Sequence, residues 1–320
     1  MKKLLCALCA LLLLSGCASP APTQEDTLTI TATTYPVYLF ALAVTEGIPG
    51  VQVECLDTGS VSCLHDYTLS VNDMKKIERS DVLILTGAGL EDFMSDALAA
   101  TDSLVIDCSA QIELLPAADH HDHDHADHDH GHFDPHYWMD PLRAQTMIDN
   151  LYNALVPVLP EQEAHLRANA DLANTQLQAT FELALDYLRL LEEQNVSVPG
   201  LITFHDGFQY FAAALDLPQL RSVEEEAGSE ASAKEIVAIS QLVKDLNIPV
   251  IFTEVNGSDA TAKAIARETH CSLTQLSMIM DGRQPTAEDA TPIAPYTEQF
   301  LNNVYTLING FAGREVLDLP

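Results

Sequence analysis

Short apolar segments alternate with helix-periodic segments along most of the chain. Runs of aliphatic and β-branched residues are followed by amphipathic stretches, and this order recurs in the second half of the sequence. Strand–helix alternation of this kind favours parallel sheets with helices on both faces. The predicted strands are 28–32, 51–55, 82–85, 104–107, 201–204, 220–223, 249–253 and 272–276. The predicted helices are 37–46, 69–79, 91–99, 142–156, 208–214, 232–246, 259–269 and 296–311.

A segment between the two halves is predicted to form one long helix. Residues 161–194 follow a proline and contain no glycine or proline. A continuous helix there would be on the order of 50 Å long, which suits a rigid connection between two lobes; two helices with a bend are the alternative. We therefore expect an α/β protein with two lobes, each a mostly parallel sheet flanked by helices, joined by a long rigid backbone helix. The expected limits are 28–158, 159–196 and 197–320.

The start of the chain has the pattern of a secretion signal. Two lysines precede the apolar run Leu4–Leu14, which is too short to cross a bilayer as a stable helix. The following Leu14-Ser15-Gly16-Cys17 looks like a bacterial lipobox, which predicts removal of residues 1–16 and a lipid on Cys17. An ordinary secretory signal is the alternative. Residues 17–27 would then be a tether, and the protein would be extracytoplasmic, lipid-anchored to the bacterial cell membrane.

Charge and cysteine content narrow the function further. The chain has 47 acidic and 15 basic residues, a formal net charge of −32, and loss of the signal with its two lysines would make it −34. This background leaves no basic patch for nucleic acid but draws cations to the surface. Cys55, Cys63, Cys108 and Cys271 remain besides the lipidated cysteine. Outside the cytoplasm they could form up to two disulfides, with Cys55 and Cys63 close enough to pair, or stay as buried thiols.

The histidines are concentrated in one segment. Eight of the twelve lie between His120 and His136, and residues 119–134 read almost entirely as Asp and His. Neutral imidazole is the commonest metal ligand, and neighbouring carboxylates orient the ring. The segment has almost nothing apolar to bury, so it cannot build a packed core. We interpret it as a flexible, low-affinity collector of metal ions whose members are His120, His121, His123, His125, His128, His130 and His132.

Three other histidines mark a candidate high-affinity site. His65 and His205 each follow a predicted strand, and His136 stands where the acidic segment meets a helix start. A lone histidine at such a junction is more often a loop or capping residue. In open α/β sheets, however, ligands bind outside the carboxyl ends of the strands. The three side chains could therefore converge on a metal ion in the cleft between the lobes.

The motifs around these histidines resemble those of the zinc/manganese class of substrate-binding lipoproteins of bacterial ABC importers. His65-Asp66-Tyr67, Asp134-Pro-His-Tyr-Trp-Met-Asp-Pro141 and His205-Asp-Gly-Phe-Gln-Tyr-Phe211 are similar to its three ligand motifs. Glu230-Ala-Ser-Ala-Lys234 resembles a further segment of the family. The resemblance covers essentially the whole mature chain. It implies two α/β lobes with the metal between them, an ABC permease and its ATPase as partners, and no enzymatic activity; we expect a monomer.

Two departures from the family pattern leave the fourth ligand open. Cys63 and Leu64 stand where an Asp-Pro or a Glu usually precedes the first histidine. Manganese-type members also supply a late carboxylate, whereas Leu273-Thr-Gln-Leu-Ser277 has no acid in register. Water is the first candidate for the fourth ligand, with Cys63 and Glu254 as the others. Three histidines without a carboxylate favour Zn²⁺ over Mn²⁺, so Zn²⁺ is the expected transported ligand.

Two other functions remain open on the sequence alone. Three histidines and a water are also the ligand set of zinc hydrolases, but hydrolysis needs a positioned general base and a substrate pocket. The sequence has no His-Glu-x-x-His pattern and no Ser/His/Asp arrangement with supporting context. A surface metal buffer or adhesin, in which the His/Asp segment is the main device, is the second rival.

Overall fold

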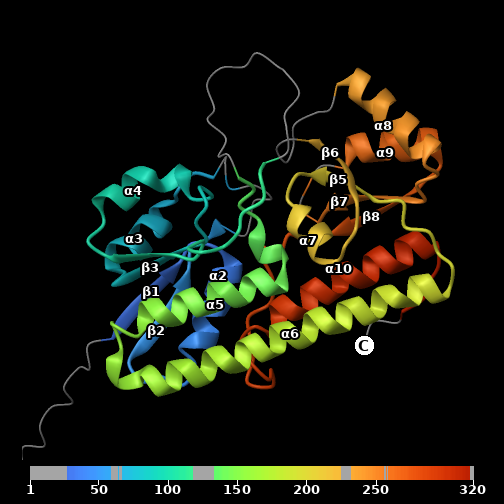
Figure 1. Ribbon diagram of the computed structural model, residues 1–320. Coiled ribbons are helices and arrows are strands. Elements are labelled where there is room, and N and C mark those ends of the chain that lie inside the picture. The colour runs from blue at the N-terminus through green and yellow to red at the C-terminus, as the bar shows by residue number, and fades with distance from the viewer. Residues whose placement is uncertain are drawn as a thin grey trace, which may run out of the picture.

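Two four-stranded parallel sheets organise the protein in the computed structural model, which describes residues 27–58, 64, 67–117, 133–224, 232–255, 257 and 259–317 (Figure 1). The first sheet has the strand order β2-β1-β3-β4 and the second has the order β6-β5-β7-β8. The strands are β1 (Leu28–Ala32), β2 (Val51–Cys55), β3 (Val82–Leu85), β4 (Leu104–Asp107), β5 (Leu201–His205), β6 (Gln219–Glu224), β7 (Val250–Glu254) and β8 (Ser272–Leu276). The predicted α/β class with two parallel sheets is confirmed.

The helices follow the predicted pattern with one local difference. They are α2 (Tyr35–Val44), α3 (Val71–Arg79), α4 (Ser95–Ala100), α5 (Pro141–Leu155), α6 (Glu163–Glu193), α7 (Gln209–Ala214), α8 (Ala233–Asp245), α9 (Ala260–Thr269) and α10 (Ala294–Ala312), with short 3-10 turns η2 (Asp92–Met94), η3 (Tyr137–Met139) and η4 (Pro160–Gln162). The helix predicted over 91–99 is divided into η2 and α4. Its first residue, Glu91, instead accepts hydrogen bonds from the backbone N–H groups of Thr86 and Gly87. The carboxylate thereby stabilises the turn at Thr86 and Gly87.

Helix α6 is continuous, as the uninterrupted sequence predicts. Its 31 residues correspond to a length of roughly 46 Å. The helix runs along both halves of the molecule and packs against α2 and α5 of the first lobe and α10 of the second (Figure 1). The bend considered as an alternative is absent from this helix, so the two lobes are joined by one rigid element.

The two lobes also share one apolar core. A single cluster of buried side chains runs from Ile30 and Phe40 of the first lobe through Leu177 of α6 to Phe300 and Ile308 of the second. Interfaces between domains permit movement by default unless they are large and hydrophobic. This interface is hydrophobic and contains fully buried aromatic rings, so it restrains the relative movement of the lobes.

The strands β3, β5 and β7 are buried along their whole length, as expected where a parallel sheet is covered on both faces. One face of each sheet meets the shared core. The other face of the first sheet packs through Leu83 and Leu85 against Ile77 and Met94. The other face of the second sheet packs against α8 and α9, with Ile202 and Ile251 among its buried residues. Burial on both sides leaves the carboxyl ends of the strands as the place for a functional site.

The strand order fixes where on that edge a site can form. In each sheet the chain moves outward in opposite directions from one pair of adjacent strands, β1 and β3 in the first and β5 and β7 in the second. A crevice outside the carboxyl ends is expected at such a reversal. His205 ends β5 and Glu254 ends the neighbouring β7. Both residues therefore lie at the position where this class of sheet binds its ligands.

Several sequence predictions fall outside the described residues. These are the signal segment and Cys17, the segment with Cys63 and His65, and the histidines from His120 to His132. In the part of the chain that the structure describes, no helix is both long and apolar enough to cross a membrane. The described cysteines, Cys55, Cys108 and Cys271, are free.

Candidate metal centre

The structure brings His136 and His205 together. The centroids of the two imidazole rings are 5.1 Å apart and their planes are 89° apart. His136 comes from the first lobe and His205 from the second, and their exposed fractions are 7% and 4%. Two histidines distant in sequence thus share one buried environment. The third predicted ligand, His65, lies outside the described residues, between Leu64 and Tyr67.

The local sequence holds His136 firmly in place. Asp134 accepts a hydrogen bond from the backbone N–H of His136 at 2.9 Å, and its Oδ1 lies 2.8 Å from the ring Nδ1. Four residues further on, Asp140 caps α5 by accepting from the N–H of Leu142, and Pro141 occupies the first helical position. The histidine is therefore fixed between a side-chain turn and a helix start.

The contact with Asp134 also decides which ring nitrogen of His136 is available. An ionised carboxylate only accepts hydrogen bonds, so Nδ1 must carry the proton. The lone pair is then on Nε2. A histidine that gives its second nitrogen to a carboxylate is the usual arrangement of a metal-ligating imidazole. His136 is thereby prepared to bind a cation through Nε2.

His205 has a carboxylate at the same position on its ring. Its Nδ1 lies 2.5 Å from Oε1 of Glu254, which is 3% exposed. Desolvation by burial would lower the pKa of His205, but the charge of Glu254, with those of Asp206 and Asp134 behind it, raises this pKa above its ordinary value. The carboxylate lies beside Nδ1, so Nε2 is the ring nitrogen that it does not occupy.

Gly207 stands in a crowded turn after His205. A Cβ atom on Gly207 would lie 2.3 Å from the terminal Cε of Met278 and 3.1 Å from the Cδ2 of His205. A larger residue would require the flexible end of the Met278 side chain to move.

Buried acceptors without partners show that the site suits a cation. Oδ2 of Asp134 and both carboxylate oxygens of Glu254 are buried, and none makes a well-formed hydrogen bond; Glu254 Oε1 touches His205 Nδ1 at an unfavourable angle. A buried carboxylate that lacks a partner is costly. Desolvation, followed by the charge of Asp134, also raises the pKa of Asp206 beside them. A metal ion among these groups would offset the accumulated negative charge.

The sequence predicts neither Asp134 nor Glu254 as a ring partner. Asp134 belongs to the motif that carries His136, and its spacing of two residues before the histidine is the signal that could identify it. Glu254 is a candidate fourth ligand in the sequence because it ends a strand. Its contact with His205 depends on the pairing of β5 with β7 through Thr203 and Phe252, which the sequence does not reveal.

The described residues alone do not complete a metal site. Among them, no group of three or more His, Cys, Asp or Glu side chains is arranged to hold an ion. Asp73 binds the residues on either side of the segment that carries His65. Its carboxylate accepts hydrogen bonds from the N–H of Asp57 before the segment, and from the hydroxyl of Tyr67 and the N–H of Ser70 after it.

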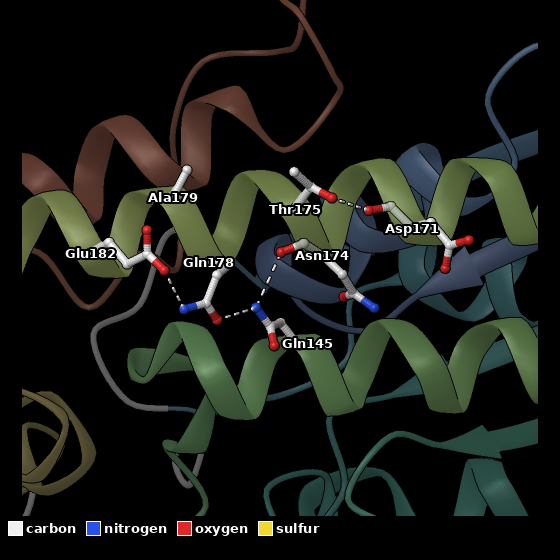
Figure 2. A pocket seen from close by; sticks show the side chains of 7 residues that line it. All are labelled: Gln145, Asp171, Asn174, Thr175, Gln178, Ala179 and Glu182. Carbon is white, nitrogen blue, oxygen red and sulfur yellow. Dashed lines mark hydrogen bonds between the residues drawn. The ribbon is translucent and has the colours of Figure 1, made fainter.

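A hollow between α5 and α6 has different chemistry (Figure 2). Its polar side chains bond one another: Nε2 of Gln145 donates to Oε1 of Gln178, and Nε2 of Gln178 donates to Oε1 of Glu182. No histidine or cysteine is among its lining residues, so it lacks the ligand types proposed here for zinc. Its lining residues are Gln145, Asp171, Asn174, Thr175, Gln178, Ala179 and Glu182.

Known proteins are similar to this chain both in sequence and in fold. The chain is 29% identical over 317 residues to zinc-binding protein AdcA of Streptococcus pyogenes serotype M3, a match that covers 92% of this chain and 58% of that protein. The chain therefore spans little more than half the length of this curated relative.

Solved structures show the same architecture. The crystal structure of ZnuA matches with a TM-score of 0.73 and 23% identity, covering 89% of this chain and 99% of that one. The substrate-binding protein FpvC from Pseudomonas aeruginosa in complex with Mn²⁺ also matches with a TM-score of 0.73 and 23% identity, covering 90% and 99%. At this identity the likeness concerns the fold, which confirms two α/β lobes and leaves the choice of metal to the ligands.

A protein-family model establishes the family to which the chain belongs. The model described as zinc-uptake complex component A periplasmic, ZnuA, matches residues 30–310, which is most of the chain. The resemblance read from the histidine motifs is thereby confirmed. The chain belongs to the ZnuA family of periplasmic zinc-uptake components.

Proposed function

We propose that the protein is the extracytoplasmic metal-binding component of an ABC importer, which captures Zn²⁺ between its lobes and delivers it to a membrane permease and its ATPase. The observation that carries this proposal is the pair His136 and His205. The two buried rings come from different lobes, and each has a carboxylate beside Nδ1, so metal binding falls to Nε2. Membership of a zinc-uptake family supports the same conclusion.

The proposed ligand set consists of His65, His136 and His205 with one further ligand. Imidazole suits zinc better than manganese, which prefers oxygen ligands. Zinc takes imidazole nitrogen at about 2.0–2.1 Å in a tetrahedral shell, so a third histidine and one more donor would complete it. Mn²⁺ remains the alternative cargo, since a protein of the same fold has been solved with that ion.

Water is the proposed fourth ligand. Glu254 is engaged with Nδ1 of His205, so a direct bond from Glu254 to the metal would take away the group that orients this ring. Cys63 lies outside the described residues, and a thiolate outside the cytoplasm would be open to oxidation. A water can be displaced when the ion is passed on, which suits transient binding.

Transport is the proposed activity in preference to catalysis. A zinc hydrolase needs a general base free to act on the metal-bound water. The carboxylates in contact with the two rings, Asp134 and Glu254, each lie beside Nδ1, away from the proposed metal-binding Nε2. This arrangement supports ion capture without turnover.

The proposed membrane anchor and the His/Asp segment both lie outside the described residues. A lipid on Cys17 would hold the protein at the membrane near its permease, and the tether would allow it to reach that partner. The histidines from His120 to His132 would act as a low-affinity antenna that raises the local metal concentration. We expect the protein to act as a monomer.

Removal of any one proposed histidine should abolish tight zinc binding. His65→Ala, His136→Ala and His205→Ala are each expected to weaken zinc affinity by more than about 100-fold, because the outer partners of ligands alone are worth roughly 10- to 100-fold. Competition with a chromophoric chelator measures the affinity. His165→Ala, on the exposed surface of α6, is the matched control. Unchanged affinity in any one of the three variants would remove that residue from the site.

The carboxylate on His205 should control the protonation of this ring. Without metal, Glu254→Gln is expected to lower the pKa of His205, because a negative charge that stabilises the imidazolium is lost. A histidine NMR titration of the metal-free protein measures the pKa, with Glu192→Gln on the exposed end of α6 as the control. The same variant should bind zinc about 10-fold more weakly. A pKa that stays unchanged would show that the contact has no electrostatic effect.

Deletion of the His/Asp segment separates transport from buffering. If the histidines of the two lobes form the tight site, a variant lacking residues 119–132 keeps one tightly bound zinc and loses several weakly bound ions. Calorimetry gives the number of sites and their affinities. Loss of all tight binding would instead assign the main metal-binding role to the segment, as expected of a surface buffer.

A further inference from the structure

The segment that carries His136 belongs to the first lobe in sequence but is fastened to the second. The hydroxyl of Tyr210, on α7, donates to the backbone carbonyl of Asp134 at 2.8 Å. The same hydroxyl accepts from the backbone N–H of Leu115 at 2.7 Å. Leu115 and Asp134 are themselves paired, since the N–H of Asp134 donates to the carbonyl of Leu115. One buried hydroxyl, that of Tyr210, thus joins two backbone segments of the first lobe, at Leu115 and at Asp134, to the second lobe.

A second set of contacts fastens the other side of His136. The indole N–H of Trp138 donates to the carbonyl of Met278 at 2.9 Å. The hydroxyl of Tyr296 donates to the carbonyl of Trp138 at 2.6 Å. Met278 and Tyr296 both belong to the second lobe, and Trp138 and Tyr296 are fully buried. The backbone is therefore held by the second lobe two residues before and two residues after His136.

Tyr210 is well placed to transmit this restraint to the metal site. It follows His205 by five residues, across the Gly207 turn that fixes the start of α7. Its ring is fully buried, lies at 6.4 Å and 76° from the ring of Tyr137, and has the guanidinium of Arg143 over its face at 4.9 Å. These contacts restrain the Tyr210 side chain. They therefore also restrain the distance from the end of β5 to the carbonyl of Asp134.

Asp134 connects Tyr210 to the imidazole ring of His136. Its carbonyl is held by Tyr210, and its carboxylate holds Nδ1 of His136. A link to the first lobe also exists, because the hydroxyl of Tyr137 donates to the carbonyl of Thr86. Tight metal binding depends on ligands that are held in their bound geometry before the ion arrives, since ordering them afterwards reduces the affinity.

We propose that Tyr210 is a positioning residue that joins His136 to the second lobe, so that His136 and His205 form a preformed two-histidine unit. This inference rests on the proposed ligand roles of the two histidines. Tyr210 does not contact the metal in this arrangement. It acts by fixing the separation and orientation of two rings that originate in different lobes.

Tyr210→Phe tests the inference, because it keeps the enclosed ring and removes the hydroxyl. The expected result is an about 10-fold weaker zinc affinity, the lower end of the effect of outer partners, measured by chelator competition on the full mature chain. The control is Tyr305→Phe, which removes a hydroxyl bonded to Tyr187 between α10 and α6. The control is expected to keep the zinc affinity of the unmodified protein.

The His136→Ala background distinguishes positioning from a general loss of stability. If Tyr210 acts through His136, Tyr210→Phe has no further effect on the residual zinc affinity once His136 is absent. An equal loss of affinity in both backgrounds would overturn the inference, as would unchanged affinity in the single variant. If His136→Ala itself binds zinc normally, the proposed ligand set fails, and the inference fails with it for a different and recognisable reason.

A second variant covers the case in which Tyr210→Phe does not fold. Tyr296→Phe removes the donor to the carbonyl of Trp138 on the other side of His136. It is expected to weaken zinc affinity in the same direction and to lose this effect in the His136→Ala background. Normal zinc affinity in a folded Tyr296→Phe protein would contradict the fastening of His136 by the second lobe.

Discussion

Contact between a carboxylate and Nδ1 is the interaction on which the candidate site depends. Asp134 makes it with His136, and Glu254 makes it with His205. Each contact places a carboxylate beside Nδ1 of a buried ring, so Nε2 is the nitrogen that can bind a metal. Without them, two imidazoles in a desolvated region would be free to rotate or to bond with each other. With them, the imidazole rings of His136 and His205 are arranged to bind a cation.

The two contacts differ in origin, and the difference explains the architecture around them. Asp134 is local, two residues before its histidine, and needs only a turn. Glu254 is distant in sequence and reaches His205 because β5 and β7 are neighbours at the reversal of strand order. The shared core and α6 then hold the lobes in register, so that a turn from one lobe and a strand end from the other meet. The fold thus supplies what the motifs alone cannot.

Much of this was accessible from the sequence. The alternation of strands and helices predicted both parallel sheets, and the absence of Gly and Pro from 161–194 predicted the continuous α6, because both depend on local patterns. The positions of His136 and His205 at the ends of structural elements predicted that they would approach each other. The exclusion of Glu91 from the helix predicted over 91–99 was not foreseen, since its carboxylate accepts hydrogen bonds from the preceding turn. Contacts across the lobes, such as Tyr210 with Asp134, also require the tertiary structure.

X-ray absorption spectroscopy of the zinc-loaded protein tests the central claim most directly, because it reports the atoms bound to the metal. The account predicts one zinc environment with three imidazole nitrogens at about 2.0–2.1 Å, one light fourth ligand and no sulfur. A sulfur neighbour at about 2.3 Å, or a shell built from oxygen with fewer than two imidazoles, would contradict it.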